Sequence, residues 1–209
     1  NGDVYQINYT QPILFNFSQK SLDLYMQIKD KAVPEFGFYL DIGSSQFLSF
    51  SPEKFFIKKN DSIYSYPIKG TIKRLENWKN DLKQIERLSK SDKDQAEHLM
   101  IVDLLRNDIG KISEFGSVKV NDLFNIKTFK TIHHMESKIK GDLLKNMKEI
   151  DIIKALFPGG SITGAPKYRA MQIIDELEQY NRGLYTGCLG IIRKNGDMDF
   201  NICIRTMTI

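Results

Sequence analysis

The sequence predicts an α+β protein. Segments in which polar and apolar residues alternate are mixed with segments of helical spacing, and no regular strand–helix–strand repeat connects them. Two pairs of strand patterns flank turn signals, one at residues 43–45 and the other at the Asn195–Gly196 pair. One long helix pattern, over residues 91–111, separates the two hairpins.

The first half of the chain alternates between the two kinds of pattern. Strict alternation over residues 4–9 predicts a half-buried strand with one polar face. Helical spacing over residues 21–31 predicts a helix, and residues 36–40 and 46–50 form the first hairpin. Short strands are expected near Phe55 and Tyr64.

The clearest helix follows. Ser91 is a suitable N-cap, Asp92 and Asp94 favour a helix N-terminus, and Gly110 is a natural stop. Residues 123–139 are less regular and predict strand and loop with some helix.

The last third has two helices and a hairpin. A short helix is expected over residues 151–157, and Pro166 fits the first turn of another. That second helix would carry an apolar stripe of Met171, Ile174 and Leu177. The hairpin joins residues 185–193 to a continuous return strand over residues 198–207.

Composition restricts the class of protein. The 209 residues are 41% hydrophobic and 27% charged, which suits a soluble globular protein with a substantial core. The 30 basic and 26 acidic residues are mixed along the chain, so the net charge of +4 does not argue for nucleic acid but suits a small anionic substrate. We find no membrane-spanning run and no signal peptide, so a cytoplasmic protein is expected.

The cysteines and the chain ends complete this description. Cys188 and Cys203 lie in apolar strand patterns, which predicts buried, reduced thiols. The chain begins at Asn1 without an initiator Met and stops at Ile209 directly after a strand. We therefore expect residues 1–209 to be one catalytic domain that is incomplete at its C-terminus and at its N-terminus.

A glycine-rich loop is the first candidate site. Gly159, Gly160 and Gly164 allow a backbone that exposes amides before the helix at Pro166, which would suit an anion. A tight turn between helices explains the same glycines equally well. A nucleotide-binding P-loop is excluded because Ala165 stands where that motif requires Lys.

Acidic residues on the long helix form a second candidate. Asp94 and Glu97 are three apart and share one helix face, so their oxygens suit Mg²⁺. A solvated face is the more common explanation of an isolated pair. Asp103 and the Arg106–Asn107–Asp108 cluster interrupt an apolar run, which predicts a structural ion pair near the site.

Single residues give weaker signals. A lysine such as Lys69 is usually a solvated surface charge. His134 is either a satisfied histidine or a general acid–base group. Arg205 lies on the inward face of the expected return strand, where a guanidinium suits a carboxylate ligand, and the hydroxyl of Tyr185 is suited to the same ligand.

Motifs in a fixed order resemble the chorismate-utilising enzymes, which include anthranilate, aminodeoxychorismate, isochorismate and salicylate synthases. The motifs span the whole chain: Tyr5–Gln6–Ile7–Asn8, Ser51–Pro52–Glu53, Pro67–Ile68–Lys69–Gly70–Thr71, residues 97–110, His133–His134–Met135–Glu136–Ser137, and residues 157–167, 182–190 and 199–206. The resemblance implies an α+β fold of two packed antiparallel sheets with helices outside. It also implies binding of chorismate through Mg²⁺.

The resemblance also implies roles for individual residues. Glu97 is similar to a Mg²⁺ ligand, and Asp94 is expected to reach the metal through water. Glu53 resembles the acid that assists departure of the 4-hydroxyl group, and His134 resembles a histidine near the ring. The implied substrate contacts are Gly70, Thr71, Gly160, Thr163, Gly164, Tyr185 and Arg205.

Two positions distinguish members of the family. The water-using members carry a Lys where this chain has Gln6, which argues against water as the nucleophile. Anthranilate synthases usually carry Ala where this chain has Lys69, whereas in aminodeoxychorismate synthases that Lys is the implied nucleophile. The expected reaction therefore forms 4-amino-4-deoxychorismate, a precursor in folate synthesis, through a covalent Lys69 intermediate.

Partners and alternatives follow from the same resemblance. Ammonia is expected from a separate glutamine amidotransferase subunit, because the chain has no Cys-based glutaminase motif. The alternative enzyme is anthranilate synthase component I, and the alternative without catalysis is a fragment that binds chorismate without turnover. Family members also have a later segment that supplies a second Mg²⁺ carboxylate and lies outside this sequence.

Overall fold

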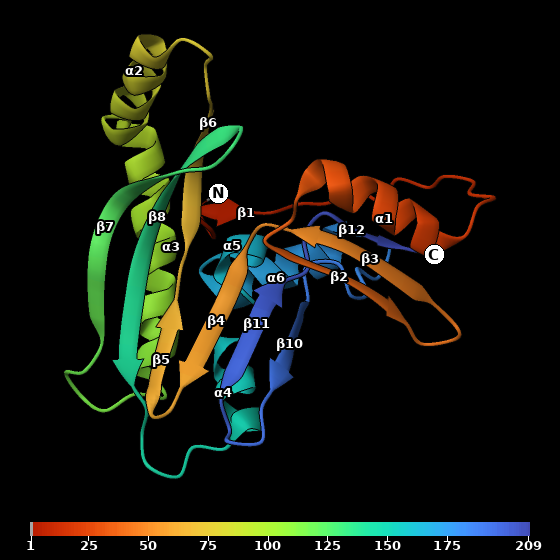
Figure 1. Ribbon diagram of the computed structural model, residues 1–209. Helices are drawn as coiled ribbons and strands as arrows, with labels where there is room; N and C mark the ends of the chain where they lie inside the picture. Colours follow the sequence, from red (N-terminus) through yellow and green to blue (C-terminus); the bar gives the residue numbers. More distant parts are fainter. Residues whose placement is uncertain (1) are drawn as a thin grey trace.

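A seven-stranded antiparallel sheet forms the centre of the structure, a computed structural model that describes residues 2–209 and leaves Asn1 outside the described residues (Figure 1). Its strands run in the order β10-β11-β4-β5-β8-β6, and β7 also pairs with β8. The strands are β4 (Lys54–Lys59), β5 (Ser62–Ser65), β6 (Ile68–Lys73), β7 (Lys119–Thr128), β8 (Ile132–Asp142), β10 (Cys188–Ile192) and β11 (Met198–Ile202).

Two smaller antiparallel sheets complete the predicted α+β class, which is confirmed. The first has the order β12-β3-β2, and the second pairs β1 with β9. Their bounds are β1 (Gln6–Ile7), β2 (Phe36–Asp41), β3 (Gln46–Ser51), β9 (Gly164–Ala165) and β12 (Thr206–Thr208). Helix α1 (Ser21–Ala32) covers the three-stranded sheet, where the rings of Tyr25 and Phe50 stack with centroids 5.3 Å apart.

Helix α3 is the main partner of the large sheet and runs beside β8 (Figure 1). Ser91 caps it as expected, because its Oγ accepts a hydrogen bond from the Asp94 amide at 3.3 Å. Ile101, Leu105 and Ile109 pack from this helix into the core. The helices of this part are α2 (Trp78–Ser89), α3 (Asp92–Gly110), α4 (Glu149–Leu156), α5 (Gly160–Thr163) and α6 (Lys167–Leu177).

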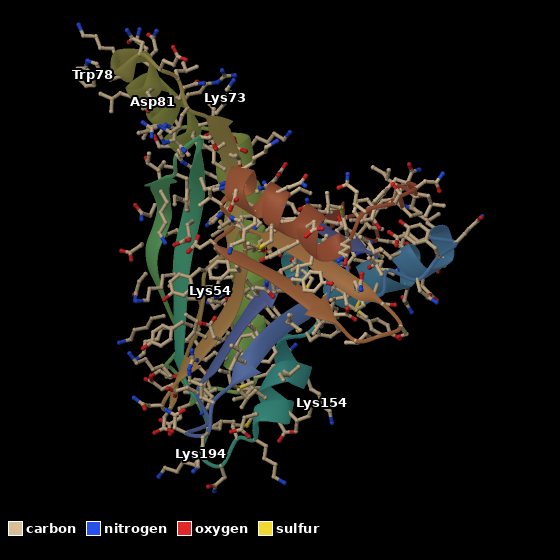
Figure 2. The ribbon with its side chains drawn as sticks, turned by 45° about the vertical axis from the view of Figure 1, so that its right-hand side comes forward. Lys54, Lys73, Trp78, Asp81, Lys154 and Lys194 are labelled. Atoms are coloured by element: carbon tan, nitrogen blue, oxygen red, sulfur yellow. The ribbon has the colours of Figure 1, made fainter. Side chains whose placement is uncertain are left out.

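Helix α2, which the sequence analysis missed, is fixed by a buried carboxylate. The Asp81 side chain accepts hydrogen bonds from the Leu75 amide at 2.9 Å, His133 Nε2 at 2.9 Å and Arg74 Nε at 3.0 Å. The Leu75 and His133 hydrogen bonds, with the nearby Arg74 guanidinium, lower the pKa of Asp81 to about 2. Figure 2 shows Trp78 and Asp81 at the end of the molecule where α2 lies.

Most other expected elements are confirmed, with four differences, of which the last, a break in the expected return strand, bears on the candidate active site. Pairing over residues 4–9 is limited to β1. Residues 123–139 belong to two long strands, β7 and β8, without the expected helix. The register of β7 against β8 shifts between Asn121 and Asn125, with positive φ at Asp122 and Phe124, and this irregularity interrupts the alternation in the sequence.

The third difference concerns α6. Ala170 is its buried residue, whereas Met171 and Leu177 of the expected core stripe are exposed and Ile174 is half-buried. The stripe lines a surface cleft. The helical period was predicted correctly, but periodicity alone does not show whether a neighbouring element covers the apolar stripe.

The thiols are reduced, as expected. Cys188 and Cys203 are free, and burial raises their pKa values to about 11 and about 12. Among the helices of residues 2–209, none combines the length and the apolar composition that crossing a membrane requires.

Candidate active site

A bulge in β6 shapes the first part of the site. Ile68 pairs with Glu136 and Thr71 pairs with His134, so Lys69 and Gly70 together oppose the single residue Met135. Gly70 has a φ of 81°, and an added Cβ would lie 3.2 Å from atoms of both Asp94 and Leu88. Glycine therefore permits both the bulge and its close approach to the helices.

Glu53 lies near the lysine of this bulge. It is half-buried in the turn between β3 and β4, and its Oε1 accepts a hydrogen bond from Ser161 Oγ at 2.7 Å. Burial raises the pKa of Glu53, while the Ser161 hydrogen bond and the positive charge of Lys69 oppose that rise. A carboxyl group in this environment holds its proton at higher pH than an exposed glutamate does.

His134 lies opposite Thr71 across the β6–β8 pairing. Its Nδ1 is hydrogen-bonded to Thr71 Oγ1 at 2.7 Å, and the residue is buried. Burial lowers the pKa of His134, the positive charge of Arg205 lowers it further, and a contact with the Gly70 backbone opposes both. The imidazole is therefore neutral near pH 7, and it lies within electrostatic range of Arg205.

Arg205 itself is not on the inward strand face that the sequence predicted. The return strand breaks after Ile202, and Arg205 is exposed with a φ of 50° before β12 begins. The reason is that β11 pairs in the seven-stranded sheet, whereas β12 pairs with β3 in the other sheet. The guanidinium is thus accessible to a ligand at the junction of the two sheets.

The candidate metal ligands lie on the first turns of α3. Asp94 packs against Gly70, and Glu97 is 4.0 Å from Lys93 with a side chain that is 40% exposed. Carboxylate oxygens on one helix face, beside a strand with candidate substrate contacts, suit Mg²⁺, which takes one or two protein carboxylates and completes its shell with water or substrate. These residues fit the implied ion, and the ligand set remains a prediction.

The acidic cluster further along α3 is only partly as expected. Asp103 and Arg106 pair at 3.2 Å, but both side chains are exposed, so the prediction of a buried pair there is wrong. Asp108 is buried and forms ion pairs with Lys111 at 2.8 Å and with Lys167. The buried pair thus joins α3 to the start of α6.

The glycines of the Gly-rich loop serve close packing. An added Cβ on Gly160 would lie 1.8 Å from Leu104 Cδ2, and one on Gly164 would lie 2.2 Å from the Gln6 carbonyl oxygen. Thr163 Oγ1 donates to the Gly159 carbonyl at 3.0 Å and is buried. The turn therefore explains these glycines on its own, and the predicted substrate contacts of Gly160, Thr163 and Gly164 stay predictions.

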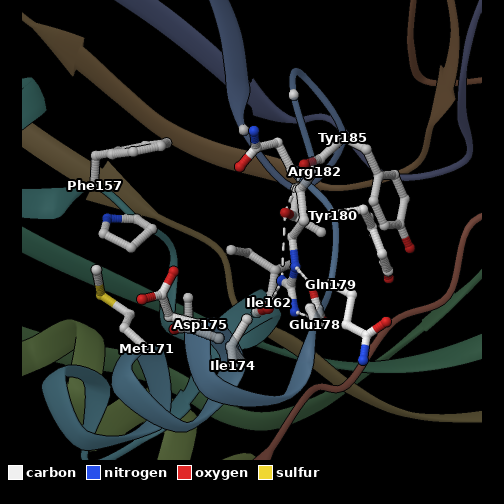
Figure 3. A pocket seen from close by; sticks show the side chains of 16 residues that line it. Phe157, Ile162, Met171, Ile174, Asp175, Glu178, Gln179, Tyr180, Arg182 and Tyr185 are labelled. Carbon is white, nitrogen blue, oxygen red and sulfur yellow. Dashed lines mark hydrogen bonds and ion pairs between the residues drawn. The ribbon is translucent and has the colours of Figure 1, made fainter.

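Tyr185 and Thr163 line a surface cleft of about 540 Å³ (Figure 3). One wall is apolar and comes from Phe157 and the Met171 side of α6. The opposite wall is polar and contains the ion pair of Glu178 with Arg182. The cleft therefore contains a different set of candidate residues from the bulge of β6.

The structure thus joins the predicted residues in two groups. Lys69, Glu53, Gly70, Thr71, His134, Asp94 and Arg205 are linked through the β6 bulge by contact or by electrostatic interaction. Thr163 and Tyr185 line the cleft. Sequence reasoning missed Ser161 and the Glu178–Arg182 pair, although Ser161 lies in the Gly-rich loop and Arg182 precedes Tyr185 in a motif that had already been recognised.

Comparison with known proteins identifies the family of the chain. The family model described as chorismate binding enzyme matches residues 1–209. Aminodeoxychorismate synthase component 1 of Escherichia coli (strain K12) is 44% identical over 208 residues, covering 100% of this chain and 46% of that protein. Anthranilate synthase component 1 of Saccharolobus solfataricus is 37% identical, covering 99% of this chain and 49% of its own length.

Solved structures show the same fold. The crystal structure of anthranilate synthase component I from Streptococcus pneumoniae superposes with a TM-score of 0.83 at 36% identity, over 92% of this chain and 42% of the other. The chain therefore spans just under half the length of these relatives. The match over its full length shows that the chain belongs to the family of chorismate-binding enzymes.

Proposed function

We propose that the protein acts as component I of an aminodeoxychorismate synthase, which converts chorismate and ammonia to 4-amino-4-deoxychorismate. The observation that carries this proposal is Lys69, which stands on the β6 bulge and acts electrostatically on Glu53. A nucleophile and an acid are the two groups that such a substitution requires. Relatives named aminodeoxychorismate synthase component 1, at 39% to 44% identity, support the same reaction.

The first step replaces the 4-hydroxyl group of chorismate. Lys69 attacks C2 of the ring as the free amine, once its ammonium group has lost a proton; the two ring double bonds shift, and the bond between C4 and the hydroxyl oxygen breaks. Protonated Glu53 gives its proton to that oxygen, so that water leaves. The raised pKa of Glu53 keeps this proton available at higher pH than in an exposed glutamate.

The second step releases the lysine. Ammonia attacks C4, the double bonds shift back, and the C2–N bond to Lys69 breaks with release of the free amine; the ammonium group formed at C4 returns a proton to Glu53. Both steps take place at C2 and C4 of the ring, so chorismate and the covalent intermediate are bound in the same orientation. The difficult direct substitution is thereby divided into two easier ones.

The other residues bind and orient chorismate. Arg205 and Tyr185 hold a carboxylate, and neutral His134, fixed by Thr71, lies near the ring. Glu97 and Asp94 would hold Mg²⁺, which would neutralise charge on the substrate. The ammonia comes from a glutamine amidotransferase subunit, in keeping with the component numbering in the names of the relatives.

Anthranilate synthase component I is the second candidate. Its support is the 37% identity to the anthranilate synthase of Saccharolobus solfataricus and the 0.83 TM-score to the one from Streptococcus pneumoniae. Lys69 counts against it, because that activity does not need an amine at this position. A protein that binds chorismate without turnover is the third candidate.

Identification of the product separates the three candidates. The intact protein is supplied with chorismate, Mg²⁺ and ammonia, and the products are identified by mass spectrometry. We expect 4-amino-4-deoxychorismate. Anthranilate as the sole product would establish the second candidate, and calorimetric binding of chorismate without any product would establish the third.

Replacement of the lysine tests the covalent step. Lys69→Ala should reduce formation of 4-amino-4-deoxychorismate to background, because the nucleophile is lost. Lys73→Ala, which removes an exposed lysine from the same strand, is the matched control and should retain activity. Undiminished product formation by Lys69→Ala would remove this residue from the nucleophile role.

A further inference from the structure

Arg182 contacts three separate segments of the chain at once. Its guanidinium donates from Nη2 to the Asn8 carbonyl at 2.7 Å and from Nη1 to the Ile162 carbonyl at 3.1 Å. Nη1 also donates to Thr186 Oγ1 at 3.4 Å, directly after Tyr185. The three segments are the end of β1, the Gly-rich loop and the turn that carries Tyr185.

Glu178 holds the guanidinium in place. Its Oε2 accepts from Arg182 Nε at 2.8 Å and its Oε1 accepts from Nη2 at 2.6 Å, a bidentate geometry that fixes the plane of the fork. Only 13% of the Arg182 side chain and 2% of the Glu178 side chain is exposed. Glu178 also accepts from the amide and the hydroxyl of Thr10, so the pair is tied to the N-terminal segment twice.

The backbone around the pair has little freedom to move independently. The Asn8 amide donates to the Thr163 carbonyl at 2.9 Å, and the Tyr5 amide donates to the Ala165 carbonyl at 2.8 Å. The residues that flank β1 are therefore hydrogen-bonded both to the Gly-rich loop and to Arg182. These two-residue strands have few ladder bonds of their own, so the arginine is a large part of what fixes them.

We propose that Arg182, oriented by Glu178, is a positioning residue that fixes Gln6, the Gly-rich loop and Tyr185 in one binding arrangement for chorismate. This rests on the proposed function, in which Tyr185 holds a carboxylate of the substrate, and on the predicted contacts of the Gly-rich loop. Arg182 acts through the backbone of these segments, so its effect is on binding geometry. Lysine at this position keeps the charge but lacks the planar fork that reaches two carbonyls and a carboxylate together.

The test compares two matched substitutions in the intact protein. Arg182→Lys removes the fork, and Arg169→Lys makes the same change at an arginine of α6 that pairs with Asp3 and Glu176 at the exposed surface. Chorismate affinity is measured by calorimetry with Mg²⁺ and without ammonia. We expect Arg182→Lys to weaken binding about tenfold, because small misplacements of binding groups are costly. Arg169→Lys should stay within about twofold of the wild type.

Hydrogen exchange gives a readout independent of substrate. Amides of residues 5–8 and 162–165 should exchange faster in Arg182→Lys than in Arg169→Lys, at a temperature where both proteins are folded. Glu178→Gln, which keeps the arginine, provides a second variant and should accelerate exchange in the same segments. Equal exchange and equal chorismate affinity in the two lysine variants would overturn the positioning role.

The two proposals fail in different ways. If the wild-type protein binds no chorismate, the proposed function is wrong and the hydrogen-exchange comparison alone judges whether Arg182 fixes these segments. If the wild type binds chorismate, and Arg182→Lys matches Arg169→Lys in affinity and in exchange, the role of Arg182 is wrong while the proposed function is uncontradicted.

Discussion

The hydroxyl of Ser161 limits the rise that burial causes in the pKa of Glu53. It donates to the carboxylate at 2.7 Å and thereby stabilises the charged form, against the effect of burial. One small side chain on the Gly-rich loop thus tunes the proposed acid of the reaction. Because 108 positions separate the two residues in the chain, local sequence patterns do not reveal this contact.

Ser161→Ala should shift the alkaline limb of the pH–rate profile upward. The variant loses the hydrogen bond that lowers the pKa of Glu53, so the carboxyl group stays protonated to higher pH. The measurement is kcat against pH for the wild type and the variant. A limb that stays in place or moves to lower pH would contradict the assignment of Glu53 as the acid.

At the residue scale, motifs identified residues that lie together in the structure, but the strand pattern misplaced one of them. Lys69, Glu53 and His134 were recognised from the sequence, and the structure connects all three through the β6 bulge. Arg205 was expected on an inward strand face, which is wrong because a single alternating pattern spans two strands that belong to different sheets. Alternation cannot reveal where a chain leaves one sheet for another.

At the scale of elements, the short helix α5 packs closely against α3 at a single glycine, Gly160. The missing side chain of Gly160 makes room for Leu104, and a Cβ there would lie 1.8 Å from Leu104 Cδ2. The distance between these two helices therefore depends on this position.

Gly160→Ala should destabilise the fold by about 1–3 kcal/mol, the usual cost of overpacking. Gly110→Ala on α3 is the matched control, because an added Cβ there meets no atom within 4 Å, and helix propensity should make it neutral or stabilising. The measurement is the free energy of unfolding in urea. Equal stability of the two variants would show that α5 moves away from Leu104 without cost.

Helices and strands with strong local signals were predicted well, and irregular ones were not. Ser91 and Gly110 bound α3 as expected, because caps act within one turn. The long strands β7 and β8 were obscured, because the shifted register between Asn121 and Asn125 breaks the two-residue period. Helix α2 was missed although Asn77 caps it and its apolar residues recur at helical spacing.

At the scale of the whole molecule, the network around Asp81 links α2 to the large sheet and makes its attachment sensitive to acid. Its hydrogen bonds to Leu75 and His133, with the nearby Arg74, lower the pKa to about 2 from the ordinary 3.8. A lowered pKa stabilises the fold above the unfolded-state value, and this stabilisation is lost as pH falls through the folded-state value.

Asp81→Asn should therefore remove part of the acid sensitivity. Above about pH 4 the variant should be less stable than the wild type, and the difference should shrink as the pH falls toward 2. Urea unfolding followed by circular dichroism at a series of pH values measures both proteins. A difference in stability that is the same at pH 2.5 and at pH 6 would show that the carboxylate charge is not the cause.

The bulge in β6 also has a consequence for how such enzymes diverge. In the bulge, Lys69 and Gly70 together face a single residue of β8. The side chain at position 69 therefore has no cross-strand partner of its own. The sheet therefore tolerates an amine or a methyl group there alike. Under the proposed mechanism, a single codon change at this position would alter the reaction and leave the scaffold unchanged, so chemistry and folding would be inherited as nearly separate traits.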